Sequence, residues 1–149
     1  MSKMQLKTTV NRHQIAKYCK YIQFQLKIKN KNLIDDIFNS LKKDHHLALG
    51  FDDQENLVFA CFCNIRYDFF NNKICDILDF FINENFENSR NINEIFNWIE
   101  NLTSQYLCHK ILYSCLTNNQ QNHRIFTANK FIIEKFVLSK DLLNQENVH

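Results

Sequence analysis

The chain has 149 residues but contains no proline and only one glycine, Gly50. Glycine and proline usually shape tight turns, and glycine also lets a backbone approach a bound phosphate closely. Asn, Lys, Ile and Phe are abundant instead, a bias that indicates an AT-rich genome. Any phosphate-binding loop in this chain must therefore work without the usual glycines.

Long apolar runs are also missing. No stretch approaches the ~20 apolar residues of a membrane span, and no apolar segment follows the charges at the start of the chain. We therefore expect a cytoplasmic protein without a membrane partner. The length and the 45% of hydrophobic residues predict one globular domain over residues 1–149.

Charge is divided unevenly along the chain. Residues 1–43 carry ten Lys and Arg against two acids, a net charge of +8, and the remaining residues sum to −6. This split indicates either an anion-binding arm or two halves of one domain that attract each other, and we favour the second interpretation. A total charge of +2 is too small for an extended phosphate footprint, so no nucleic-acid partner is expected.

Six cysteines raise the alternatives of a disulfide framework or a zinc site. Most lie in predicted strands or at the end of a predicted helix, and no Cys/His spacing matches a zinc module. They are better explained as free thiols that pack in the core, so no metal is expected. The six are Cys19, Cys61, Cys63, Cys75, Cys108 and Cys115.

Hydrophobic periodicity divides the chain into short strands and helices. The expected strands are 21–29, 46–51, 57–67, 74–82, 110–116 and 131–139. The expected helices are a peripheral basic one at 8–20 within the first 20 residues, then 32–43, one that begins near 90, and 120–129. Polar turns at 52–56 and 70–73 should join three of the strands as a meander. This order predicts an α/β fold with a mixed, mostly antiparallel, twisted sheet of six to seven strands and helices on both faces.

The stretch from Lys73 to Leu107 organises this order. A nearly all-apolar strand is followed by the polar loop 83–89 and then by a helix with one apolar stripe. Either Asn88 or Ser89 is expected to cap that helix. The free N–H groups at its start would face whatever lies above the loop, which predicts an anion site.

The order of elements, together with a late segment, resembles the GNAT superfamily of N-acetyltransferases over roughly residues 21–143. Bacterial members of one branch carry S-G-V-Q-R…A-H-R-F-Y and then an aromatic in the last strand. Here Ser114, the pair His123-Arg124, and Phe136 match that pattern. The resemblance implies acetyl-CoA as the coenzyme, an amine acceptor, and a fold in which homodimers are common.

Four positions depart from the family's pattern. Glu87 aligns with an Arg or Gln, Arg90 with the first loop glycine, and Ile92 with a Gly or Ala. The glutamate would repel a diphosphate, although the guanidinium of Arg90 could compensate by binding a phosphate. The family's tyrosine, which protonates the departing thiolate, aligns with Phe126, and Tyr106 and Tyr113 are the nearest alternatives in sequence.

The resemblance implies a site at the end of the central strand. Asp79 is the candidate catalytic base, with a hydrogen-bonded structural acid as the alternative. Strand alternation predicts that Asp79 shares a face with Cys75 and Ile77. The expected coenzyme-binding residues are Phe81, Ile82, Asn88, Ser89, Arg90, Asn91, Ile92, Asn93, His123 and Phe126.

The sequence is compatible with two functions. The first is an enzyme that transfers the acetyl group of acetyl-CoA to an amine of a small molecule or protein. The second is a degenerate GNAT-fold module that has lost the coenzyme and acts in protein or ligand binding. Loss of both loop glycines and the tyrosine favours the module, whereas the overall resemblance favours the enzyme.

Overall fold

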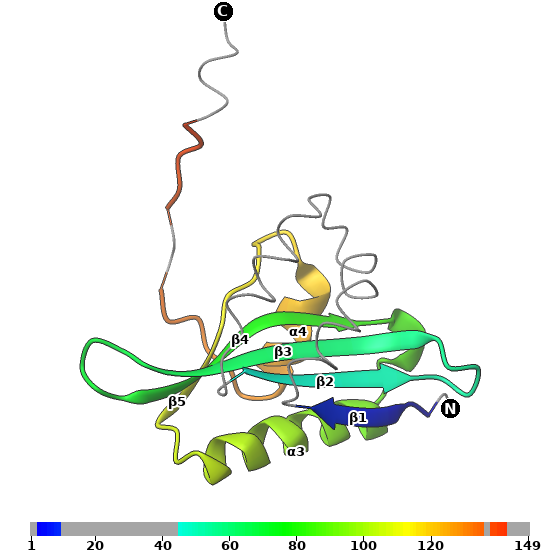
Figure 1. Ribbon diagram of the computed structural model, residues 1–149. Coiled ribbons are helices and arrows are strands. Elements are labelled where there is room, and N and C mark those ends of the chain that lie inside the picture. The colour runs from blue at the N-terminus through cyan, green and yellow to red at the C-terminus, as the bar shows by residue number, and fades with distance from the viewer. Residues whose placement is uncertain (1–2, 10–44, 136–137, 143–149) are drawn as a thin grey trace, which may run out of the picture.

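The computed structural model describes residues 3–9, 45–135 and 138–142. Five strands from these residues form one sheet in the order β1-β2-β3-β4-β5 (Figure 1). The first four pair in antiparallel fashion and β5 runs parallel to β4. The strands are β1 (Gln5–Thr9), β2 (His45–Phe51), β3 (Leu57–Tyr67), β4 (Lys73–Ile82) and β5 (Lys110–Tyr113). A mixed, mostly antiparallel sheet in an α/β fold is thereby confirmed.

Three helical segments of the described residues accompany this sheet. The short 3-10 helix η1 (Glu84–Phe86) follows β4 and leads into α3 (Ser89–Gln105), and α4 (Gln120–Ala128) follows β5. Rings from α3 and α4 both contact Phe80 of β4, which places these two helices on one face of the sheet. The helix and strand expected at 32–43 and 21–29 lie outside the described residues.

Two sequence predictions about the ends of the sheet are wrong. Thr8 and Thr9 end a strand rather than begin a helix, because they pair with the edge of β2 and β-branched residues suit that place. The rest of the predicted helix 8–20 lies outside the described residues. Residues 131–135 and 138–139 form no strand. Phe131 packs instead edge-on against the rings of Phe96 and Phe126. It is therefore partly buried by α3 and α4, and not by the sheet.

The turns work without glycine because acidic side chains cap them. The Asp52 carboxylate accepts the amides of Gln54 and Asn56 at 2.9 and 2.8 Å, and Asp68 does the same for the next turn. Glu55 and Asn71 take positive φ values of 62° and 64°. A side chain in this left-handed region costs about 1–2 kcal/mol, and the carboxylate hydrogen bonds help to offset that cost.

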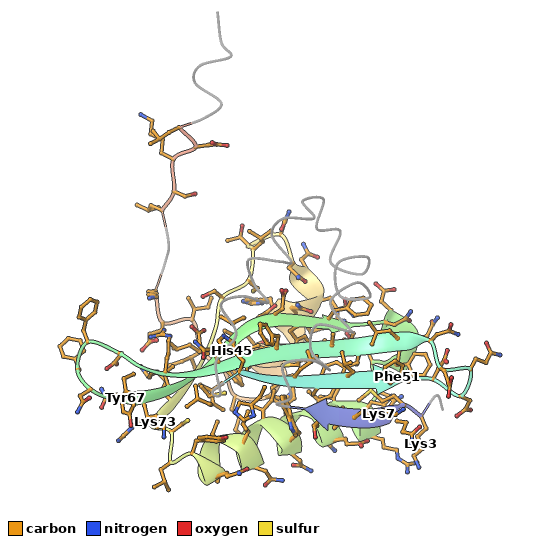
Figure 2. The ribbon with its side chains drawn as sticks, in the orientation of Figure 1. Lys3, Lys7, His45, Phe51, Tyr67 and Lys73 are labelled. Atoms are coloured by element: carbon orange, nitrogen blue, oxygen red, sulfur yellow. The ribbon has the colours of Figure 1, made fainter. Side chains whose placement is uncertain are left out.

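The β3–β4 hairpin projects beyond its neighbours, with Tyr67 and Lys73 at its outer end and Lys7 and Phe51 at the opposite end of the sheet (Figure 2). Lys73 lies 5.7 Å from the ring centroid of Tyr67, a cation–π distance. Between the hairpin tip and residues 134–135 lies an open hollow of about 710 Å³. Most of its charged residues form ion pairs: Arg66 with Asp76 of β4 at 2.9 Å, and Lys110 with Glu134.

The core lies between the sheet and the two helices. Alternate residues of β3 are buried against the apolar stripe of α3, and Phe126 of α4 completes the cluster. The main contributors are Phe59, Cys61, Cys63, Ile77, Phe80, Ile95, Phe96, Ile99 and Phe126. The three strand cysteines Cys61, Cys63 and Cys75 are free and buried, as predicted from the sequence. The prediction of core packing is wrong for Cys115, which follows β5 and is exposed.

The single glycine sits where no side chain fits. A Cβ on Gly50 would lie 2.7 Å from Met4 Sδ and 2.9 Å from Phe59 Cβ. We therefore expect Gly50→Ala to lower the free energy of unfolding by about 1–3 kcal/mol through overpacking, as measured by urea denaturation.

A double-mutant cycle with Met4→Ala provides the control for this prediction. Trimming Met4 removes the nearest contact, so Gly50→Ala should cost less in that background. An equal cost in both backgrounds would show that contact with Met4 is not what excludes a side chain at position 50.

Candidate active site

A β-bulge interrupts the central strand. Phe62 pairs with Asp79 and Cys63 pairs with Ile77, so Leu78 is an extra residue on β4. The bulge reverses the alternation beyond it. Asp79 therefore lies on the face opposite Ile77, and the sequence-based prediction that the two share a face is wrong. Phe80 takes the core-facing place instead.

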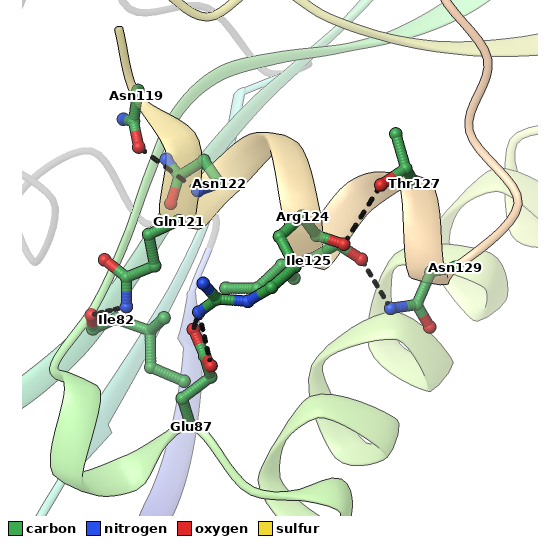
Figure 3. Close-up of polar contacts among 9 residues, drawn as sticks. All are labelled: Ile82, Glu87, Asn119, Gln121, Asn122, Arg124, Ile125, Thr127 and Asn129. Atoms are coloured by element: carbon green, nitrogen blue, oxygen red, sulfur yellow. Dashed lines mark hydrogen bonds and ion pairs between the residues drawn. The ribbon is translucent and has the colours of Figure 1, made fainter.

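Beyond the bulge, one edge of β4 has no neighbouring strand among the described residues. The β4–β5 pairing ends at the pair Ile77 and Tyr113. Beyond this pair, side chains of α4 form the hydrogen bonds to this edge of β4. Asn122 Nδ2 donates to the carbonyl of Phe80 at 3.0 Å. Gln121 Nε2 donates to the carbonyl of Ile82 at 3.1 Å (Figure 3). These two bonds attach the first turn of α4 to the end of β4.

The amides of Phe80 and Ile82 lie on the same open edge as these carbonyls, because the N–H and C=O of a strand residue point to one side. The amide of Asn83 donates to Val58 of β3 at 2.8 Å, which fixes this alternation. The amide of Phe81 therefore faces β3. Within the part of the chain that the structure describes, Phe80 and Ile82 present two N–H donors to the gap between β4 and β5.

The start of α3 supplies a second group of donors. Asn88 is the cap: its side chain accepts the amide of Asn91 at 3.0 Å, and Ser89 is the first helical residue. Asn91 is fully buried, and its side chain donates to the carbonyl of Phe86 at 2.8 Å. Asn91 therefore fixes the loop. The amides of Ser89 and Arg90 have no acceptor among the described residues and point beyond the helix end.

Glu87 and Arg124 form an ion pair at this end of α3. Both carboxylate oxygens of Glu87 accept from one guanidinium nitrogen of Arg124 at 2.8 Å (Figure 3). The glutamate is half-buried, whereas 63% of the arginine side chain is exposed. The pair links the loop to α4 and neutralises the carboxylate that would otherwise repel an anion.

Asp79 stands in an apolar stretch of β4. Burial raises the pKa of its carboxyl above the usual 3.8, and no described residue forms an ion pair with it. A carboxylate with a raised pKa holds a proton more readily than an exposed one, as a general base requires. Its position next to the bulge places it at the mouth of the β4–β5 gap.

On α4, Phe126 is buried and stacks on Tyr113, with ring centroids 4.1 Å apart. The hydroxyl of Tyr113 accepts a hydrogen bond of 2.7 Å from Asn122 Nδ2. Burial is the main cause that raises the pKa of Tyr113 to about 12. Tyr106, the other tyrosine considered from the sequence, ends α3 and packs against His46.

The remaining predicted coenzyme residues occupy varied places. Ile92 packs partly against the core, whereas Asn93 and His123 are exposed. Sequence reasoning missed Gln121 and Asn122, whose role depends on how α4 docks on β4. Among the described residues, no group of His, Cys, Asp and Glu side chains could hold a metal ion, and none of their helices is long and apolar enough to span a membrane.

Solved structures resemble this chain over nearly its whole length. The aminoglycoside 6'-N-acetyltransferase AAC(6')-Ih from Acinetobacter baumannii superposes with a TM-score of 0.72 and 14% identity, covering 93% of this chain and 98% of that one. The chain has the GNAT acetyltransferase fold.

Two further GNAT-fold structures extend the comparison. AAC(6')-Iy, solved with a bisubstrate analogue of coenzyme A, gives a TM-score of 0.73 at 10% identity, over 94% of this chain and 99% of that one. Glucosamine-6-phosphate N-acetyltransferase from Arabidopsis thaliana gives 0.66 at 12% identity, over 94% and 99%. No protein-family model matches the sequence, and no curated protein matches it.

The electrostatics of Asp79 yield a stability prediction. Because its folded pKa is raised, the folded state keeps the proton longer than the unfolded state, and the free energy of unfolding falls as pH rises above 3.8. Asp79→Asn removes this penalty. The variant should melt at a higher temperature than the wild type at neutral pH, and the difference should vanish below the ordinary aspartate pKa.

Asp76→Asn is the matched control on the same strand. This change removes the ion pair with Arg66 and should lower the melting temperature at neutral pH, by an amount equivalent to about 0.2–1 kcal/mol. If Asp79→Asn were also destabilising at neutral pH, Asp79 would be a paired structural acid.

Proposed function

We propose that this GNAT-fold protein is an N-acetyltransferase that uses acetyl-CoA and an acceptor amine. The observation that carries the proposal is the open edge of β4, which leads from the bulge to the start of α3. It offers amide donors at Phe80 and Ile82, and then the amides of Ser89 and Arg90. An elongated ligand with amides at one end and a diphosphate at the other matches this order of donors.

Each part of the chain has a distinct role in this proposal. The amides of Phe80 and Ile82 bind the acyl end, and the α3 amides with the Arg90 guanidinium bind the diphosphate. Acetyl-CoA supplies the acetyl group as a thioester. Asp79 accepts the proton that the amine loses when its nitrogen attacks the acetyl carbon. Pairing with Arg124 makes Glu87 compatible with a nearby diphosphate.

The acceptor is proposed only as an amine of a small molecule or protein. Two of the similar structures belong to enzymes named for aminoglycoside and glucosamine-6-phosphate acetylation. The three structures compared share 14% identity or less with this chain. They have the same fold, but the residues that line their acceptor pockets need not be the same.

A GNAT-fold module without activity is the second candidate. Two observations favour it. The carbonyls of Phe80 and Ile82 already bond to α4 side chains. The carboxylate of Glu87, two residues before the start of α3, already pairs with Arg124. A ligand that needed those carbonyls would have to displace Asn122 and Gln121. The amides on the same edge remain available, and for this reason we favour the enzyme.

Titration calorimetry with acetyl-CoA and with coenzyme A tests the proposal. We expect both ligands to bind at micromolar concentrations because the donors are already in place. Absence of heat and of thermal stabilisation at millimolar ligand would contradict the enzyme and support the module.

Glu87→Gln gives a sharper test of the diphosphate end. Removing the carboxylate frees Arg124, so coenzyme A should bind about fivefold more tightly, equivalent to ~1 kcal/mol for a partly exposed charge. Pantetheine, which has no phosphate, should bind equally to both proteins.

Glu84→Gln is the control in the same loop, because Glu84 is exposed and has no ion pair among the described residues. It should leave both affinities unchanged. Weaker binding of coenzyme A to Glu87→Gln would show that the ion pair holds the site in its binding conformation.

A further inference from the structure

Tyr113 lies where β4 and β5 separate. It is the last residue of β5 and pairs with Ile77, directly before the bulge. Its ring stacks on Phe126 at 4.1 Å and lies 6.2 Å from the ring of Phe80. The side chain therefore borders the gap that the open edge of β4 leaves.

The hydrogen bonds around Asn122 define what the Tyr113 hydroxyl can do. Asn122 is buried, and its Nδ2 lies 3.0 Å from the carbonyl of Phe80, which can only accept. This contact identifies the nitrogen and the oxygen of the amide. The same nitrogen lies 2.7 Å from the Tyr113 hydroxyl. The hydroxyl oxygen must therefore be the acceptor of that bond.

A phenol whose oxygen accepts still has its own proton to donate. No described residue accepts that proton, so the Tyr113 O–H is an available donor at the edge of the gap. The pKa of about 12, which burial raises and the hydrogen bond from Asn122 lowers in part, keeps the phenol protonated at neutral pH.

We propose that Tyr113 is the general acid that protonates the departing thiolate, a role that rests on the proposed acetyl transfer. The amine nitrogen bonds to the acetyl carbon, the carbon–sulfur bond breaks, and the sulfur takes the Tyr113 proton as Asp79 takes the proton of the amine. Transfer of the Asp79 proton to the Tyr113 phenolate through solvent restores both groups. The net change is thioester plus amine to thiol plus amide.

The other described tyrosines do not fit this role. Tyr106 lies at the far end of α3. The centroid of its ring is 5.0 Å from that of His46 and 5.5 Å from Lys73 Nζ. Tyr67 lies at the exposed outer end of the β3–β4 hairpin (Figure 2). Phe126 has no hydroxyl, but its stacking on Tyr113 fixes the direction of the phenol. The acid thus comes from β5 and is oriented by α4.

The test follows the thiol of bound coenzyme A, whose thiolate absorbs in the ultraviolet. A phenol that donates to the sulfur stabilises the thiolate, so Tyr113→Phe should raise the pKa of the bound thiol by about one unit, a tenfold loss of ionisation. Tyr106→Phe removes the same atom elsewhere and should leave the thiol titration at its wild-type position. Calorimetry on each variant checks that coenzyme A still binds.

Turnover gives the second readout once an acceptor amine is found. Tyr113→Phe should lower kcat about 100-fold, the lower end of general acid catalysis, with little change in KM. A thiol titration identical to that of the wild type would overturn the role of Tyr113, and so would a variant that no longer binds coenzyme A. A wild-type protein that fails to bind coenzyme A would instead refute the proposed function itself.

Discussion

The geometry of the site depends on the two hydrogen bonds that the side-chain amide of Asn122 donates. Its nitrogen donates both hydrogens, one to the carbonyl of Phe80 and one to the hydroxyl of Tyr113. These bonds join β4, β5 and α4 at the point where the two strands separate. Without them the buried carbonyl of Phe80 would lose its partner, at a cost of about 1–3 kcal/mol, and α4 would no longer define one side of the gap.

The scarcity of glycine constrains the rest of the molecule. Turns are closed by aspartate carboxylates, and Leu107 and Lys130 take positive φ values after α3 and α4. The loop before α3 has no glycine either, so its shape comes from the cap by Asn88 and the buried side chain of Asn91. A phosphate bound here would therefore be held by the helix amides and by arginine side chains, and not by a glycine-rich loop.

Much of the fold could be predicted from the sequence. Strands β2, β3 and β4 and helices α3 and α4 lie close to where the sequence predicts them, and the loop between β4 and α3 is where it was expected. The bulge at Leu78 could not be predicted. It depends on the register with β3, and the hydrophobic pattern of β4 does not indicate it. Tyr113 and Asn122 become a pair only when α4 docks, so sequence reasoning considered the tyrosine but not its partner.

The open edge of β4 and the start of α3 are proposed to bind coenzyme A together. A titration of the full chain with coenzyme A, followed by the amide resonances in nuclear magnetic resonance spectra, tests this directly. We expect the amides of Phe80, Ile82, Ser89 and Arg90 to shift together and to saturate with one dissociation constant. Shifts confined to other residues, or none at these four amides, would contradict it.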